Sequence, residues 1–239
     1  MTEEEWLRYE DPEPMIEVLD RASSATRRKS RLLSCAACFR LGQLIIFPQS
    51  QFAVQVAEKW VDGEATDEQL WEAWLAASPA QLFAEPRHTD IPEYSAAMAA
   101  VKTASPKPNG HHNLPPIWSA LSVMEEVIEA VGRSAAGLSS ADWTQDVATV
   151  REASELAAIL RDIFGNPFRP VAFDPAWRTS TAVALAEGMY DRRDFGAIPI
   201  LADALQDAGC EDEQILSHCR GDGPHVRGCW VVDLVLGKE

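Results

Sequence analysis

The chain has 239 residues, 46% of them hydrophobic, so it can bury a sizeable core without help from a metal or a disulfide. Its formal net charge of -16 argues against the broad positive field by which proteins bind nucleic acids or anionic membranes. A nucleic-acid partner is therefore not expected.

The cysteines and the first residues indicate a reducing compartment. There are five cysteines, an odd number, and the opening "MTEEEWLRYE" is acidic and lacks the apolar segment of a secretion signal. The longest apolar runs, such as "LIIF" and "CWVV", are far shorter than the roughly 20 residues of a membrane-spanning helix. The sequence predicts a cytoplasmic protein with reduced thiols and no membrane segment.

The first half of the chain predicts four helices. Asp11 and Pro12 form a helix start, residues 25–47 form a broad apolar helix that Pro48 stops, and residues 50–63 end at a capping glycine. "TDEQ" at residues 66–69 is a capping box for a fourth helix. A proline-rich loop at 103–116 then divides an N-terminal lobe, 1–102, from a C-terminal lobe, 117–239, although the two can pack as one domain.

The second half predicts a helical hairpin and a run of short helices. The hairpin covers residues 117–136 and 141–164, and a proline-pinned aromatic segment follows it. Short helices are predicted at 179–192, 197–208, 212–220 and 224–236, each bounded by Gly or Pro. The valines of the last segment also suit a strand, but no second strand is available to pair with it. The fold is predicted as all-α, an irregular bundle of about ten or eleven helices that can form two lobes.

Several stretches resemble a large bacterial family. They are "ILRDIFGNPFRPV" from Ile159, "DPAW" from Asp174, "PILADALQDAGC" from Pro199, and the acidic opening with "RLLSCAACFR". The most specific is "HCRGDGPHVRGCWVVDLVLGK" from His218, which fits a family signature HCRxxGxHVRGCWVVDLxLGK. The family is uncharacterised, so the resemblance implies no activity, substrate or cofactor.

Histidines and cysteines, the residue types that commonly bind zinc, occur close together around the turn in this signature. If Pro224 starts the last helix, His225 and Cys229 share one helix face, and His218 and Cys219 end the preceding helix across the turn. A same-face pair on the second helix could complete such a site if the two ends of the chain meet. The candidate metal ligands are Cys219, His225, Cys229, His218, Cys35 and Cys38, with Cys210 as a further candidate.

The favoured interpretation of these residues needs no cofactor. The spacing matches no zinc finger or ribbon, cysteines are among the most often buried residues, and histidines can hydrogen-bond helix ends. Zinc is the alternative cofactor. A further alternative makes Cys219 or Cys229 a nucleophile, with His218 or His225 as base and Asp233 or Asp222 to orient it.

A second set of candidates is basic. Residues 21–57 contain no acid, and "RGDGPHVR" offers glycines and cations at an expected helix start, where anions bind. The candidate anion or partner contacts are Arg220, Arg227, Arg27, Arg28, Lys29 and Arg31. The favoured alternative is that these side chains pair with acids elsewhere in the fold.

No motif fixes a reaction, and an enzyme is not the leading expectation. The leading hypothesis is a non-enzymatic helical module that binds a protein partner in a groove between the lobes or on the basic second helix. The alternative is a metal-dependent or Cys/His-dependent enzyme centred on the corner from His218 to Cys229.

Overall fold

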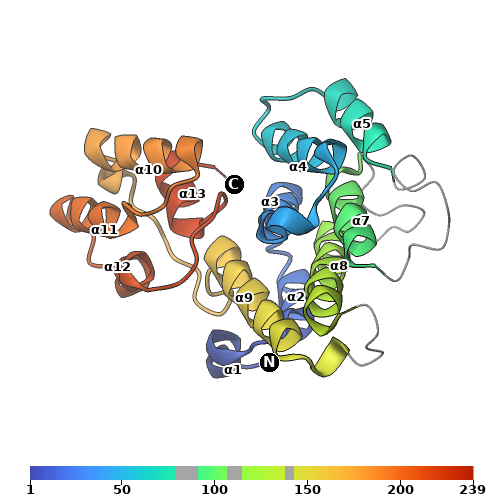
Figure 1. Ribbon diagram of the computed structural model, residues 1–239. Coiled ribbons are helices and arrows are strands. Elements are labelled where there is room, and N and C mark those ends of the chain that lie inside the picture. The colour runs from blue at the N-terminus through green and yellow to red at the C-terminus, as the bar shows by residue number, and fades with distance from the viewer. Residues whose placement is uncertain (79–90, 107–114, 138–142, 239) are drawn as a thin grey trace.

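The computed structural model describes residues 1–78, 91–106, 115–137 and 143–238. These residues form twelve α-helices and no strand, which confirms the predicted all-α class (Figure 1). Most of the proline-rich loop, residues 107–114, lies outside the described residues. No helix among the described residues is long and apolar enough to cross a membrane.

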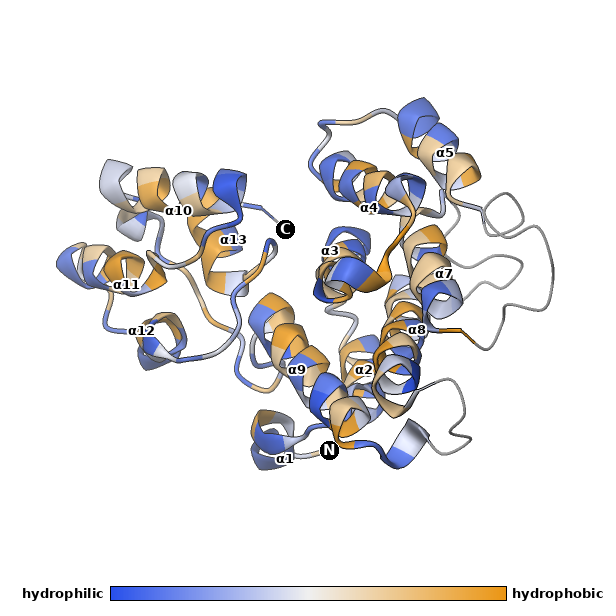
Figure 2. Cartoon of the chain, in the orientation of Figure 1, coloured by the Kyte–Doolittle hydropathy of each residue, from blue (hydrophilic) through white to orange (hydrophobic). Residues whose placement is uncertain are grey.

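The first helical unit surrounds one central helix, α3 (Arg27–Arg40), which is buried without interruption from Ser30 to Cys38. Thr26 caps α3 by accepting a hydrogen bond from the backbone N-H of Lys29. Four helices pack on α3, namely α4 (Pro48–Val61), α7 (Pro92–Ala104), α8 (Pro116–Ala136) and α9 (Val147–Phe164). Helix α2 (Pro12–Arg21) packs on α8 and α9, and α5 (Asp67–Ala76) packs on α4 and α7. Each exposes a hydrophilic face and turns a hydrophobic one inward (Figure 2).

Two boundaries in this unit differ from the sequence prediction. The helix predicted for residues 25–47 ends at Arg40, and Pro48 is the first residue of α4, where a proline's fixed φ and missing N-H suit a helix start. The helix predicted from residue 141 begins at Val147, where Asp146 supplies the cap. The short α1 (Glu3–Arg8) packs on the end of α9, and Trp6 donates a hydrogen bond to the Gly165 carbonyl at 3.1 Å.

The second helical unit consists of α10 (Ser180–Arg192), α11 (Ile198–Asp207), α12 (Glu213–Arg220) and α13 (Trp230–Leu236). It stands beside α9 and α3 in Figure 1, coloured orange to red. The helix predicted for residues 224–236 begins only at Trp230, so residues 224–229 form a non-helical segment. This segment leaves the helical path because Asp162, on α9, accepts the backbone N-H of Val226 at 2.9 Å.

The hydrophobic side chains form two separate clusters. One runs from Trp6 to Ile163, and the other runs from Ala182 to Val235. The division between them falls in the extended segment at 165–179, whereas the predicted lobe boundary was the loop at 103–116. Helix α8, expected to belong to the C-terminal lobe, contributes Ile117 and Met124 to the first cluster because it packs on α3 and α7.

Candidate metal centre

Four side chains from four different parts of the chain meet where the two units touch. They are Asp162 near the end of α9, His218 on α12, His225 in the non-helical segment, and Cys229 at the start of α13. One potential ligand atom from each lies within 4.8 Å of the others. We call these four residues the quartet.

The potential ligand atoms of the quartet lie close enough together to surround a single metal ion. Oδ1 of Asp162 lies 2.8 Å from Nδ1 of His225 and 3.1 Å from Nε2 of His218. The thiol of Cys229 lies 3.2 Å from that same Nε2 and 3.9 Å from that same Nδ1. Ligands of a tetrahedral zinc ion are about 3.3 to 3.7 Å apart when each bond is about 2.0 to 2.3 Å long. The quartet therefore needs only small shifts to hold a metal.

The same geometry differs from that of a catalytic triad. In a triad the base contacts the nucleophile through one ring nitrogen and the orienting acid through the other. In the quartet each histidine presents one nitrogen to both the thiol and the carboxylate. Burial, reinforced by the charge of Asp162, also raises the pKa of the Cys229 thiol well above its usual value, which disfavours the nucleophilic thiolate.

Asp162 is ionised within the quartet. Its side chain is only 2% exposed, and burial alone would raise the pKa of this carboxyl group. Hydrogen bonds from His218 and His225 outweigh the burial and lower the pKa below its ordinary value. Asp162 is therefore a carboxylate, and Oδ2 is held by the Val226 N-H while Oδ1 faces the other three side chains.

Four of the seven predicted ligands lie elsewhere, and one of these, Cys210, is buried in the second hydrophobic cluster. Cys219 follows His218 in sequence but is buried in the second hydrophobic cluster. Cys35 contacts the Val54 carbonyl at 3.9 Å and Cys38 contacts the Thr103 hydroxyl at 3.2 Å, both within the first cluster. The structure thus unites His218, His225 and Cys229, and it adds Asp162, which sequence reasoning missed. Asp162 could have been noticed in the sequence because it is an acidic residue between Leu160 and Ile163, near the end of a helix whose buried face is otherwise mostly apolar.

The basic candidates mostly pair with acids and carbonyls. Arg31 donates to the carbonyls of Thr103 and Ser105 at 2.6 and 2.8 Å. Arg220 pairs with Asp203 at 2.9 Å on the surface, Lys29 lies 5.9 Å from the ring centre of Phe164, and Arg27 is exposed. Arg28 and Arg227 belong to a larger group.

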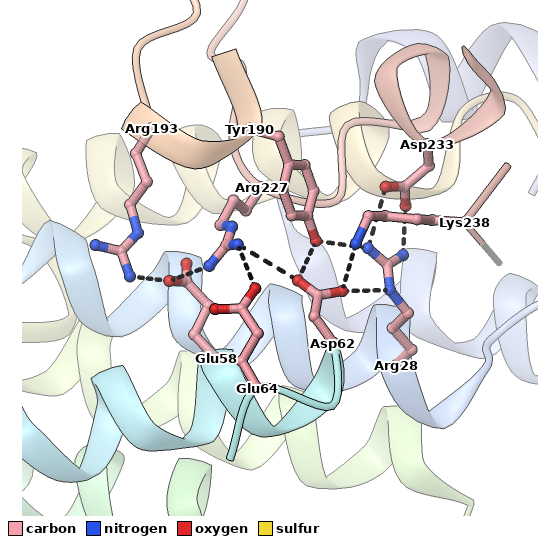
Figure 3. Close-up of polar contacts among 9 residues, drawn as sticks. All are labelled: Arg28, Glu58, Asp62, Glu64, Tyr190, Arg193, Arg227, Asp233 and Lys238. Carbon is pink, nitrogen blue, oxygen red and sulfur yellow. Dashed lines mark hydrogen bonds and ion pairs between the residues drawn. The ribbon is translucent and has the colours of Figure 1, made fainter. Parts of the chain in front are cut away.

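That group joins the two units through alternating charges, and we call it the interface ion network (Figure 3). Its centre is Asp62, which accepts hydrogen bonds from the Tyr190 hydroxyl at 2.6 Å and from Lys238 at 3.1 Å. Arg28 pairs with Asp233 at 2.6 Å, and Arg227 pairs with Glu58 at 3.1 Å. The members are Arg28, Glu58, Asp62, Glu64, Tyr190, Arg193, Arg227, Asp233 and Lys238. In Figure 3 the side chains of the second unit point onto those of α3 and α4 and the turn after α4.

A cavity of about 520 Å³ adjoins the quartet. Asp162, His218 and His225 lie in its wall, together with residues of α1, α9 and α12. The buried thiol of Cys229 is not among the lining residues. The cavity therefore approaches the quartet from the side of the two histidines and the carboxylate.

The segment that carries His225 and Cys229 depends on Gly228. Its φ is +96°, and a Cβ there would lie 2.9 Å from Cδ1 of Leu32. We expect Gly228→Ala to lower the free energy of unfolding by about 2 to 4 kcal/mol, from backbone strain and overlap. Gly223→Ala is the matched control, because its Cβ meets no atom within 4 Å and φ is not positive. Urea unfolding of both variants tests this, and equal losses would contradict it.

Comparison with protein-family models, curated proteins and solved structures finds no match for this chain. The resemblance of the C-terminal signature to a bacterial family therefore stays an expectation.

Proposed function

We propose that this chain is a zinc-binding, non-enzymatic helical protein, in which one zinc ion fastens the second helical unit onto α9. Asp162 belongs to the first unit, whereas the other three members of the quartet come from α12, α13 and the segment between them. The observation that supports the proposal is the convergence of two ring nitrogens, one carboxylate oxygen and one thiol. Four protein ligands complete a tetrahedral shell, which is typical of structural zinc sites.

The donor set selects zinc among the common biological cations. Magnesium and calcium prefer shells of oxygen atoms, and the quartet offers only one carboxylate. Two imidazoles and a thiolate suit zinc, and the same four donors also accept cobalt as a spectroscopic substitute. Because Asp162 lies on α9, the metal would connect the first helical unit to the second, and not only the three ligands between His218 and Cys229 to one another.

The test is metal analysis of the protein expressed without a His-tag and purified without added metal. We expect close to one zinc per chain and, after exchange with cobalt, a thiolate-to-cobalt absorption band. Cys229→Ala should abolish both the zinc and the band. Cys219→Ala should retain them, because this neighbouring buried cysteine lies outside the quartet. Substoichiometric metal that added zinc does not restore would refute the proposal.

The protein partner expected from the sequence stays a prediction, and a different binding role is proposed for the cavity beside the quartet. Among the large exposed apolar side chains, Trp71 and Leu75 share α5 and Val147 and Val150 share α9, whereas Leu7, Phe52 and Ile200 each lie on another helix. The cavity beside the quartet is lined by residues of both units, and its volume of about 520 Å³ exceeds the 270 Å³ of a second cavity that both units also line. We therefore assign the binding role of the protein to this cavity, as a proposal.

A further inference from the structure

We propose that the cavity beside the quartet binds a small organic acid, whose carboxylate pairs with Arg161 and whose apolar body lies against the cavity walls. This goes beyond the zinc centre, since Arg161 is not a member of the quartet.

The cavity has the size and the walls of a small-molecule site. Its volume of about 520 Å³ falls within the range of about 300 to 1,000 Å³ that such sites occupy. It lies between α1 and α9 on one side and α12 with the following turn on the other. Apolar side chains supply much of the wall, namely Trp6, Leu7, Phe164, Val171, Pro224 and Trp230.

Arg161 supplies the positive charge of this cavity. Its Nη1 donates to the carbonyls of Trp6 and Tyr9 at 3.1 and 2.8 Å, which fixes the guanidinium in the wall. Within the part of the chain that the structure describes, no carboxylate lies within 4.0 Å of Arg161, and no hydrogen bond from its Nε or Nη2 is found. Neither of these nitrogens is among the buried unpaired atoms, so both remain accessible.

The other charged side chains in the wall that the argument concerns already have hydrogen-bonding partners. Arg169, the second arginine of the lining, pairs with Glu3 at 2.7 Å. The carboxylate of Asp162 accepts hydrogen bonds from two histidines and one backbone amide. In the described part of the chain Arg161 thus has no carboxylate within ion-pair distance, although the charge of Glu10 acts on it from farther away. A guanidinium with two free adjacent donors matches a carboxylate in bidentate geometry. One cation on an apolar wall favours a monoanion over a phosphate dianion.

Calorimetric titration with matched pairs of probes tests this inference. The acids are butyrate, hexanoate and 3-phenylpropanoate, each compared with its own neutral amide, and inorganic phosphate is a further probe. We expect at least one acid to bind about tenfold more tightly than its amide, which is a difference of about 1.4 kcal/mol in binding free energy. The inference is overturned if no acid binds below about 10 mM, a Kd worth only about -3 kcal/mol. It is also overturned if the amides bind equally well or if phosphate binds best.

Variants locate the carboxylate. Arg161→Gln should remove the preference for acid over amide, and Arg161→Lys should retain part of it. Because Arg161 also holds backbone carbonyls, a second pair of variants uses Leu7, which is 56% exposed and lines the cavity. Leu7→Glu should weaken acid binding several-fold through charge repulsion, whereas Leu7→Gln should not. Equal effects of the Glu and Gln variants would contradict a charged ligand in this cavity.

The same titrations with zinc-free protein distinguish acid binding at Arg161 from the proposed zinc site. If the protein takes up no zinc but binds the acid through Arg161, only the zinc proposal fails. If acid binding survives Arg161→Gln and disappears with a chelator, the acid binds the metal and the role of Arg161 is overturned.

Discussion

Removal of zinc is expected to lower the free energy of unfolding by about 4 kcal/mol. This value applies when the zinc-loaded sample contains free zinc at a thousand times the Kd of the folded protein for zinc. The reason is that the unfolded chain does not hold Asp162 near the other three ligands, so the metal binds the folded state selectively. Chemical denaturation of one protein preparation, with zinc, with a chelator, and with zinc restored, measures this difference.

The two neighbouring cysteines provide the matched control for this experiment. Cys219 and Cys229 are both fully buried, so each Cys→Ala variant loses a similar apolar contact. Only Cys229 belongs to the quartet. We expect the stability of Cys229→Ala to respond weakly to zinc and that of Cys219→Ala to keep the full response. The same zinc response in both variants would contradict the assignment of Cys229 as a ligand.

Asp62→Asn is expected to lower the free energy of unfolding by about 3 to 5 kcal/mol, the usual cost of leaving buried ionic partners unpaired. The Asp62 side chain is 3% exposed and faces Arg28, Lys238, Arg227 and the Tyr190 hydroxyl. The amide keeps the shape of the side chain but removes the charge opposite these cations. Urea unfolding at neutral pH gives the measurement.

Asp203→Asn is the control for a charge lost outside the interface ion network. Asp203 pairs with Arg220 on the surface, and its side chain is 71% exposed. Exposed pairs contribute about 0 to 1 kcal/mol, so this variant should unfold almost like the parent protein. A loss at Asp203 as large as that at Asp62 would show that general charge effects, and not the interface, account for the result.

The pH dependence of the same variant gives a second measurement. Burial alone would raise the pKa of Asp62, but hydrogen bonds from Tyr190 and Lys238 and the charge of Arg28 lower it below its usual value. A lowered folded-state pKa stabilises the fold above the unfolded-state value of about 3.9, and this contribution is lost as pH falls through the folded value. Asp62→Asn should therefore flatten the loss of stability in acid. The neighbouring Asp233 is present in both proteins, and burial raises its pKa with a smaller contribution from the charge of Asp62.

Local signals in the sequence predicted most helices, because their causes lie within one or two turns. The capping box of Thr66 and Gln69 forms as expected, and α8 spans Pro116–Ala136 as its apolar spacing indicates. Signals that depended on distant residues failed. Pro224 has the features of a helix start, but the backbone of the next residues is held by Asp162 and by the close approach of Gly228 to Leu32.

The site was predictable in part for the same reason. His218, His225 and Cys229 lie within twelve positions of one another, so the sequence placed them at one corner. His225 and Cys229 still meet without a shared helix, because a turn in which the Cys229 N-H bonds the Val226 carbonyl at 2.9 Å brings them together. Asp162 and the acids that pair with Arg28 and Arg227 come from remote parts of the chain, and no local pattern identifies such partners.

The sequence separations within the quartet and the interface ion network indicate the order in which their contacts form during folding. His218 and Cys229 are 11 positions apart, whereas His225 and Asp162 are 63 apart and Arg28 and Asp233 are 205 apart. Contacts between distant positions cost more chain entropy and form more slowly. The helices of the second unit can thus assemble first, and a fourth ligand reaches the metal only when this unit docks on α9. A bound metal ion would then mark the completion of folding.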